Sequence, residues 1–130
     1  MIEPRQALYA HLLADSGVME VVKAIYQGRA PAGAEKPLLL IQPLISRVPR
    51  RDLGGVAYKQ ARIQVTAMAK TQKEVEKAIK AVIDAVEGYV GTMAGDLQVI
   101  LVEIDNDRQI AQDAIEEIHH HVDVMVIYKG

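Results

Sequence analysis

The chain has 130 residues, of which half are hydrophobic and a quarter charged, as is typical of one globular domain. It has no cysteine, so disulfides, thiolate metal sites and cysteine nucleophiles are excluded. A net charge of −2 and the lack of Phe and Trp argue against a nucleic-acid-binding protein. No apolar stretch reaches the length of a membrane span. We therefore expect a single cytoplasmic domain over residues 1–130, with neither a membrane nor sequence-specific nucleic acid as a partner.

The first quarter of the chain is predicted to be helical. Pro4 is suited to a first helical turn, and apolar residues recur at helical spacing up to Val22. Asp15, Ser16 and Gly17 interrupt this pattern, which predicts one helix of about three turns followed by a shorter one. A short edge strand over residues 24–26 and a loop over residues 29–37 follow.

The next segment predicts an antiparallel hairpin. Residues 38–41 are all apolar, and the apolar run continues to Ser46 past Pro43, which places this strand at an edge or gives it a bulge. Residues 47–56 then connect it to a strand over residues 62–70. The connection contains three arginines, so we expect an exposed, arginine-rich tip.

The chain is organised around the strand at residues 62–70 and the helix that follows it. Alternate residues of the strand are apolar, which indicates one buried face. The period then becomes helical, with apolar residues at Val75, Ile79, Val82, Ile83 and Val86. Thr71 and Glu74 form a capping box at its start, and Gly88 or Gly91 is expected to end it. The helix should therefore fold back over the strand.

Two more strands are predicted, over residues 97–104 and 119–128, with a turn at residues 92–96 and a polar connection at residues 105–117. The predicted fold class is α+β: a mostly antiparallel sheet of about four main strands, with an N-terminal helical segment and one long helix packed on one face. Six apolar residues are expected on the other sheet face and indicate oligomerisation: Met68, Ile100, Val102, Ile104, Met125 and Ile127.

Charge is unevenly distributed along the chain. Residues 47–62 carry about +4 and residues 103–117 about −5 by formal count. Such segments can pair within one subunit or between neighbouring subunits. The candidate interface residues are Arg47, Arg50, Arg51, Asp105, Asp107 and Glu116.

No catalytic or cofactor-binding pattern stands out. His119 and His121 share a face of a strand and can approach one metal ion, but no third ligand lies nearby in sequence. The spacing from Asp105 to Glu116 partly fits a calcium loop, yet Ile110 occupies the position that requires Gly. We therefore expect no enzyme activity, no cofactor and no metal site, and a solvated acidic connection in place of the calcium loop.

The order of local motifs resembles the tail completion, tail-terminator-like proteins of long-tailed bacteriophages and prophages. The resemblance is carried by residues 7–15, by Val18 to Tyr26, by residues 37–42 and 45–49, and by residues 61–65 with the Thr71 helix. Gln27, where these proteins often have Pro, and the triple His depart from the pattern.

This resemblance implies a structural virion protein that forms a ring, commonly a hexamer, at the end of the tail tube. The implied partners are further copies of the chain, the major tail tube protein and the head-completion or connector protein, with assembly in the host cytoplasm and a final place in the virion tail. It implies no active site. The alternatives left open are a small oligomeric binding or adaptor domain and a metal-binding protein unrelated to virions.

Overall fold

The computed structural model describes residues 2–42, 46–51, 57–112 and 117–129, with the backbone alone for residues 46–51, 57, 106 and 108–112. Its elements follow one another as α1 (Pro4–Leu13), α2 (Ser16–Val21), β1 (Ala24–Gln27), β2 (Leu38–Ile41), β3 (Ser46–Arg51), β4 (Ala57–Ala69), α3 (Gln72–Val86), β5 (Gly91–Met93), β6 (Leu97–Gln112) and β7 (Glu117–Lys129). The α+β class is confirmed.

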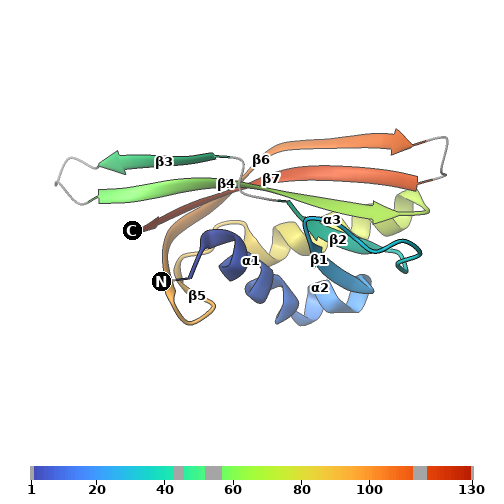
Figure 1. The fold of residues 1–130 in the computed structure, drawn as a ribbon, viewed down its shortest axis with the longest axis horizontal. Coiled ribbons are helices and arrows are strands. Elements are labelled where there is room, and N and C mark those ends of the chain that lie inside the picture. Colours follow the sequence, from blue (N-terminus) through green and yellow to red (C-terminus); the bar gives the residue numbers. More distant parts are fainter. Residues whose placement is uncertain (1, 43–45, 52–56, 113–116, 130) are drawn as a thin grey trace.

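One sheet contains all the described strands, in the order β1-β2-β4-β7-β6-β5, with β3 paired to β4 as well. The two long strands β4 and β7 pair antiparallel from Tyr58 and Lys129 to Ala69 and Ile118. The strands β2 and β3 both pair with β4, β2 through residues 65–68 and β3 through residues 57–62. The helices all lie on one face of this sheet, while the β3–β4 and β6–β7 hairpins point to opposite ends (Figure 1).

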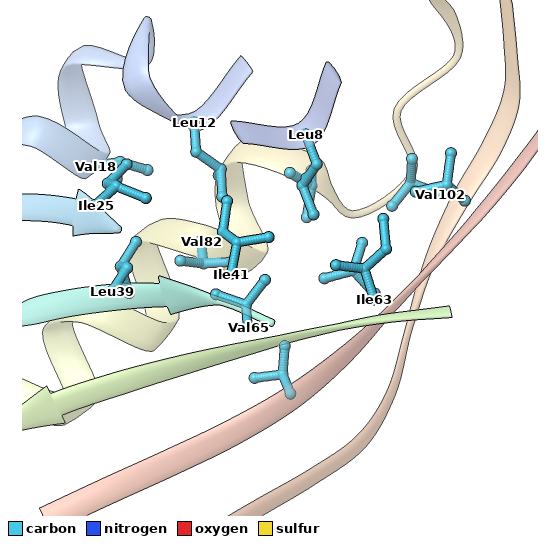
Figure 2. Packing of buried hydrophobic residues seen from close by; sticks show 14 of the residues in the cluster. Leu8, Leu12, Val18, Ile25, Leu39, Ile41, Ile63, Val65, Val82 and Val102 are labelled. Carbon is cyan, nitrogen blue, oxygen red and sulfur yellow. The ribbon is translucent and has the colours of Figure 1, made fainter. Parts of the chain in front are cut away.

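The core lies between the helices and the sheet. Ile63, Val65, Ala67 and Ala69 of β4 have no exposed surface, and Val122, Val124 and Val126 of β7 are equally buried. Leu8 and Leu12 of α1 and Val82 of α3 project toward Ile63 and Val65 (Figure 2). The alternation read from the sequence is therefore confirmed for both long strands, because each has one face under the helices.

The predicted helix boundaries are confirmed. The backbone N–H of Glu74 donates to the Thr71 hydroxyl over 3.2 Å, and that hydroxyl donates to the Glu74 carboxylate over 2.9 Å. Gly88 follows the C-cap residue of α3 with φ of +76°, a conformation that glycine adopts without strain. The Asp15 carboxylate accepts the Val18 N–H and begins α2, where the sequence predicted the break.

Several fold predictions were wrong in detail. The described residues contain seven strands where about four were expected, and β1 pairs parallel with β2, so the sheet is mixed. The predicted turn at residues 92–96 is confirmed only for residues 94–96, because Thr92 and Met93 belong to β5, which pairs with β6. The predicted acidic connection is largely strand, because β6 continues to Gln112 and β7 begins at Glu117. Pro43 lies outside the described residues.

Candidate assembly surfaces

The three candidate arginines lie on β3, a strand at the border of the sheet. Arg47, Arg50 and Arg51 pair in register with Ala61, Tyr58 and Ala57 of β4. The antiparallel pairing predicted from the sequence is present, but the three arginines lie in its outer strand β3, and the prediction that they form the connecting tip was wrong. We call Ser46–Arg51 the basic edge. Residues 52–56 lie outside the described part of the chain, as do the side chains of the three arginines.

Two of the candidate carboxylates lie on β6. Asp105 and Asp107 are exposed, and the register with β7 shifts between residues 105 and 108. A β-bulge of this kind inserts one extra residue and bends the strand. We call residues 103–112 the acidic edge. Glu116 lies outside the described residues.

The basic edge and the bulge of the acidic edge are far apart within one subunit. Arg50 is opposite Tyr58, whereas Asp105 is opposite Asp123, which in turn pairs with Gln64. Six positions of β4 separate those two levels of the sheet, or roughly 20 Å at 3.3 Å per residue. The end of the basic edge therefore does not meet the acidic bulge in its own chain.

One contact does join the two charged segments within the subunit. Arg62 of β4 donates to Asp123 of β7 over 2.8 Å and to Asp105 of β6 over 3.0 Å. These hydrogen bonds raise the pKa of Arg62 further above its ordinary value, the bond to Asp123 contributing most and the bond to Asp105 next. The arginine thereby links three adjacent strands on the face that the helices leave open.

Sequence reasoning missed this network, although it left a signal. Asp123 is 4% exposed and stands alone among the apolar residues of β7. A carboxylate inside an apolar strand needs a charged or hydrogen-bonding partner, because burying an unpaired charge is costly. Arg62, on the polar side of the neighbouring strand, was the obvious candidate for that partner.

The three histidines lie where β7 begins, and each has a different partner. His119 donates to Glu117 over 3.0 Å, His120 donates to Asp107, and His121 and Thr66 share a hydrogen bond of 2.8 Å. Lys36 pairs with Glu117 over 2.9 Å. The bond to His119, and next the bond to Lys36, lower the pKa of Glu117. Among the described residues no group of three His, Asp or Glu side chains is arranged to hold a metal ion.

The second face of the sheet is less apolar than predicted. Val102 is 1% exposed and belongs to the core, and Ile104 packs against the core. The register shift between Val99 and Leu101 explains this, because the extra residue moves the next positions to the other face. Ile100, at that bulge, is 38% exposed.

A surface depression of about 490 Å³ lies between α2, α3 and the start of β2. Two of its titratable residues already have structural partners, since Lys36 pairs with Glu117 and the Glu74 carboxylate accepts the Thr71 hydroxyl. Among the described residues, its lining includes no Ser, Thr, Cys or His side chain.

None of the helices in the described part of the chain is long and apolar enough to cross a membrane. A comparison with curated proteins gave no match. Among solved structures, a chain from the virion of a native gene transfer agent particle has the same fold, with a TM-score of 0.81 and 15% sequence identity over 98% of this chain and 95% of that one. The family model described as tail completion protein gp17 matches residues 6–129. That match covers nearly the whole chain, so this protein belongs to the tail completion protein family and is a structural protein of the virion tail.

Proposed function

We propose that the protein acts as a single domain that terminates the tail tube as a ring of identical subunits, commonly six, and joins the tail to the head connector. Membership of the tail completion family supports a place at the tail end. The observation that carries the ring is the presence of two oppositely charged strand edges at opposite ends of one sheet. The proposed partners are other copies, the major tail tube protein and the head-completion or connector protein.

The charge distribution favours a head-to-tail arrangement. A ring with cyclic symmetry uses two different patches of each subunit, one meeting the other on the next copy. The candidate residues that the structure describes divide into two such patches, Arg47, Arg50 and Arg51 on one and Asp105 and Asp107 on the other. Glu116, which lies outside the described residues, is the remaining candidate. Because Arg50 and Asp105 lie roughly 20 Å apart along the sheet, attraction between their patches acts between copies. The protein is made in the host cytoplasm and then enters the virion tail.

Reversing the charge of the basic edge tests this proposal. The double substitution Arg50→Glu with Arg51→Glu should weaken assembly, and the loss should be greatest at low salt because ions screen surface charges over about 10 Å at 0.1 M. The matched control is Lys73→Glu with Lys77→Glu, which makes the same change of charge on the exposed side of α3. Multi-angle light scattering of the free protein and electron microscopy of tails give the readouts.

The two assays test the role of the basic edge and distinguish a ring from a monomeric adaptor. The proposal requires rings at the ends of wild-type tails and of control tails, and fewer rings with the basic-edge variant. Equal assembly of both variants at every salt concentration would reject the role of the basic edge. A wild-type protein that stays at the 14.3 kDa of one chain, both free and when bound to tails, would instead be a monomeric adaptor.

A further inference from the structure

The basic edge and the acidic edge are both open sides of the same sheet. Among the described residues, β3 pairs with β4 alone. On β6, the short strand β5 covers only residues 97–99, and the carbonyl of Tyr89 accepts the N–H of Val102. No described strand pairs with the outer side of residues 103–112. Open edges present backbone N–H and C=O groups that can pair with another chain.

Charge decides which edges can meet. The basic edge carries three arginines and no acidic residue, while the acidic edge has Glu103, Asp105 and Asp107 against Arg108. Two basic edges, or two acidic edges, would place like charges side by side, which is destabilising in a sheet. Pro49 also lacks an N–H, which limits indiscriminate pairing of β3. Only the pairing of a basic edge with an acidic edge brings opposite charges together.

We propose that the basic edge of one copy adds as a strand to the acidic edge of the next copy, so that a single β-sheet continues from subunit to subunit. The inference rests on the proposed ring and names the contact that builds it. The partner is a second copy of this chain, and the contact is a backbone hydrogen-bond ladder in which the charges set the choice of partner.

The topology fixes the direction of that ladder. Each of the pairs β3–β4, β4–β7 and β7–β6 is antiparallel, so β3 and β6 run in opposite directions. When two copies present the same face of the sheet, β3 of one therefore lies antiparallel to β6 of the other. Antiparallel pairing needs no crossover connection and suits the contact of two separate chains.

The stagger of the two edges is compatible with a closed ring. Within one subunit, Val48 in β3 pairs with Gln60, Gln60 pairs with Ile127, and Ile127 pairs with Leu101, so the middle of the basic edge is level with Leu101. The middle of the acidic edge is near Asp107 instead. Because of the bulge, that offset is five positions of β7, from Ile127 to Val122, or about 17 Å at 3.3 Å per residue, across four strands that span about 19 Å. Closure then requires the strands to tilt by about 40° from the ring axis, which is within the 35–45° of closed barrels.

Cross-linking tests the contact directly, because the chain has no cysteine of its own. One chain carries Val48→Cys on the basic edge and another carries Ile110→Cys on the acidic edge, and a short bismaleimide joins cysteines without requiring an ideal register. The mixture should give several-fold more covalent dimer than either variant alone, both at high protein concentration and in assembled tails. A chain with both substitutions should give a ladder of products up to the mass of the ring.

The matched control replaces Ile110→Cys by Lys80→Cys, on the exposed side of α3. Equal cross-linking of Val48→Cys to this helix position, or cross-linking of either edge variant to itself, would overturn the inference. Rings that form without a link between the two edges would also overturn it and leave the proposed function standing. If light scattering and microscopy find no ring of the unmodified protein, the proposed function fails first and the inference fails with it.

Discussion

Replacing Arg62 by Met is expected to destabilise the fold, because it removes the guanidinium that pairs with the buried Asp123 carboxylate. Methionine replaces the aliphatic part of the arginine side chain but has no guanidinium to donate to Asp123 and Asp105. The Asp123 side chain is 6% exposed, the Arg62 side chain 28% and the Asp105 side chain 56%. The substitution therefore removes a donor from one buried carboxylate, Asp123, and from one exposed carboxylate, Asp105.

The magnitude follows from this difference in burial. Removing one partner of a fully buried ion pair costs about 3–5 kcal/mol, whereas an exposed pair contributes about 0–1 kcal/mol. Arg62 is partly exposed and Asp123 has a further contact, so we expect a loss of about 2–3 kcal/mol for Arg62→Met. Asp105→Asn should cost less than about 1 kcal/mol. For a chain of this length, 2–3 kcal/mol corresponds to a decrease in Tm of roughly 6–12 °C.

The free energies of unfolding of Arg62→Met and Asp105→Asn are measured by urea denaturation, followed by circular dichroism. The second substitution Asp123→Leu, added to Arg62→Met, should recover at least half of the lost stability, because it removes the buried carboxylate that was left with too few partners. The reasoning is refuted if Arg62→Met unfolds at the same urea concentration as the wild type. It is also refuted if Asp105→Asn is as destabilising as Arg62→Met.

Three further substitutions test the core, the helix cap and the decrease of stability at acid pH. Leu12→Ala should lower the free energy of unfolding by about 2–5 kcal/mol, since Leu12 is fully buried, and a loss below 1 kcal/mol in urea would contradict its place in the core. Thr71→Ala should cost about 1 kcal/mol through the lost N-cap, whereas Lys73→Ala should be neutral within about 0.5 kcal/mol in the same assay. The folded-state pKa of Glu117 lies below its ordinary 4.5, so its stabilising contribution is present above that pH and is lost as the pH falls through the lower folded value. Glu117→Gln should therefore reduce stability at neutral pH and flatten its decline below about pH 4.5, and parallel stability curves for the two proteins would disprove the linkage.

The parts of the fold that the sequence predicts correctly are those in which one face is buried. In β4 the residues from Ile63 to Ala69 alternate, and the helix that follows has its apolar stripe, because both elements pack against one core. Thr71 also carries a local hydrogen-bonding signal that does not depend on tertiary contacts. Periodicity and capping were sufficient to place these elements.

The acidic edge could not be predicted in this way. Asp and Asn are uncommon in strands, and the stretch from Asp105 to Asp107 therefore indicated a loop. The structure makes it part of β6 because the backbone pairs with β7 on either side of a bulge. A bulge moves every later residue to the other face without leaving a sequence signal of its own, which is also why Val102 and Ile104 were assigned to the wrong face.

Of the candidate site, the sequence identified the two charged segments but not their arrangement. The contact between Arg62 and Asp105 depends on the register of three strands, which no local pattern specifies. The separation of Arg50 from Asp105 depends on the same register.

The energy of the proposed ladder explains how such a protein can be soluble alone and still form a ring on a tail. The six residues of the basic edge direct about half of their backbone groups outward, so one ladder has about five hydrogen bonds, worth about 0.5–1.5 kcal/mol each. That total, about 2.5–7.5 kcal/mol, reaches only the lower part of the 4–15 kcal/mol lost when two free subunits associate. A single contact between two copies is therefore weak, and we expect the free protein to be mainly monomeric at micromolar concentration in light scattering. A tail tube that holds the copies side by side raises their effective concentration, and the last contact of a closed ring forms without a further association step. Stable rings of the free protein at nanomolar concentration would contradict this reasoning, because they would require a much larger apolar interface than the two edges provide.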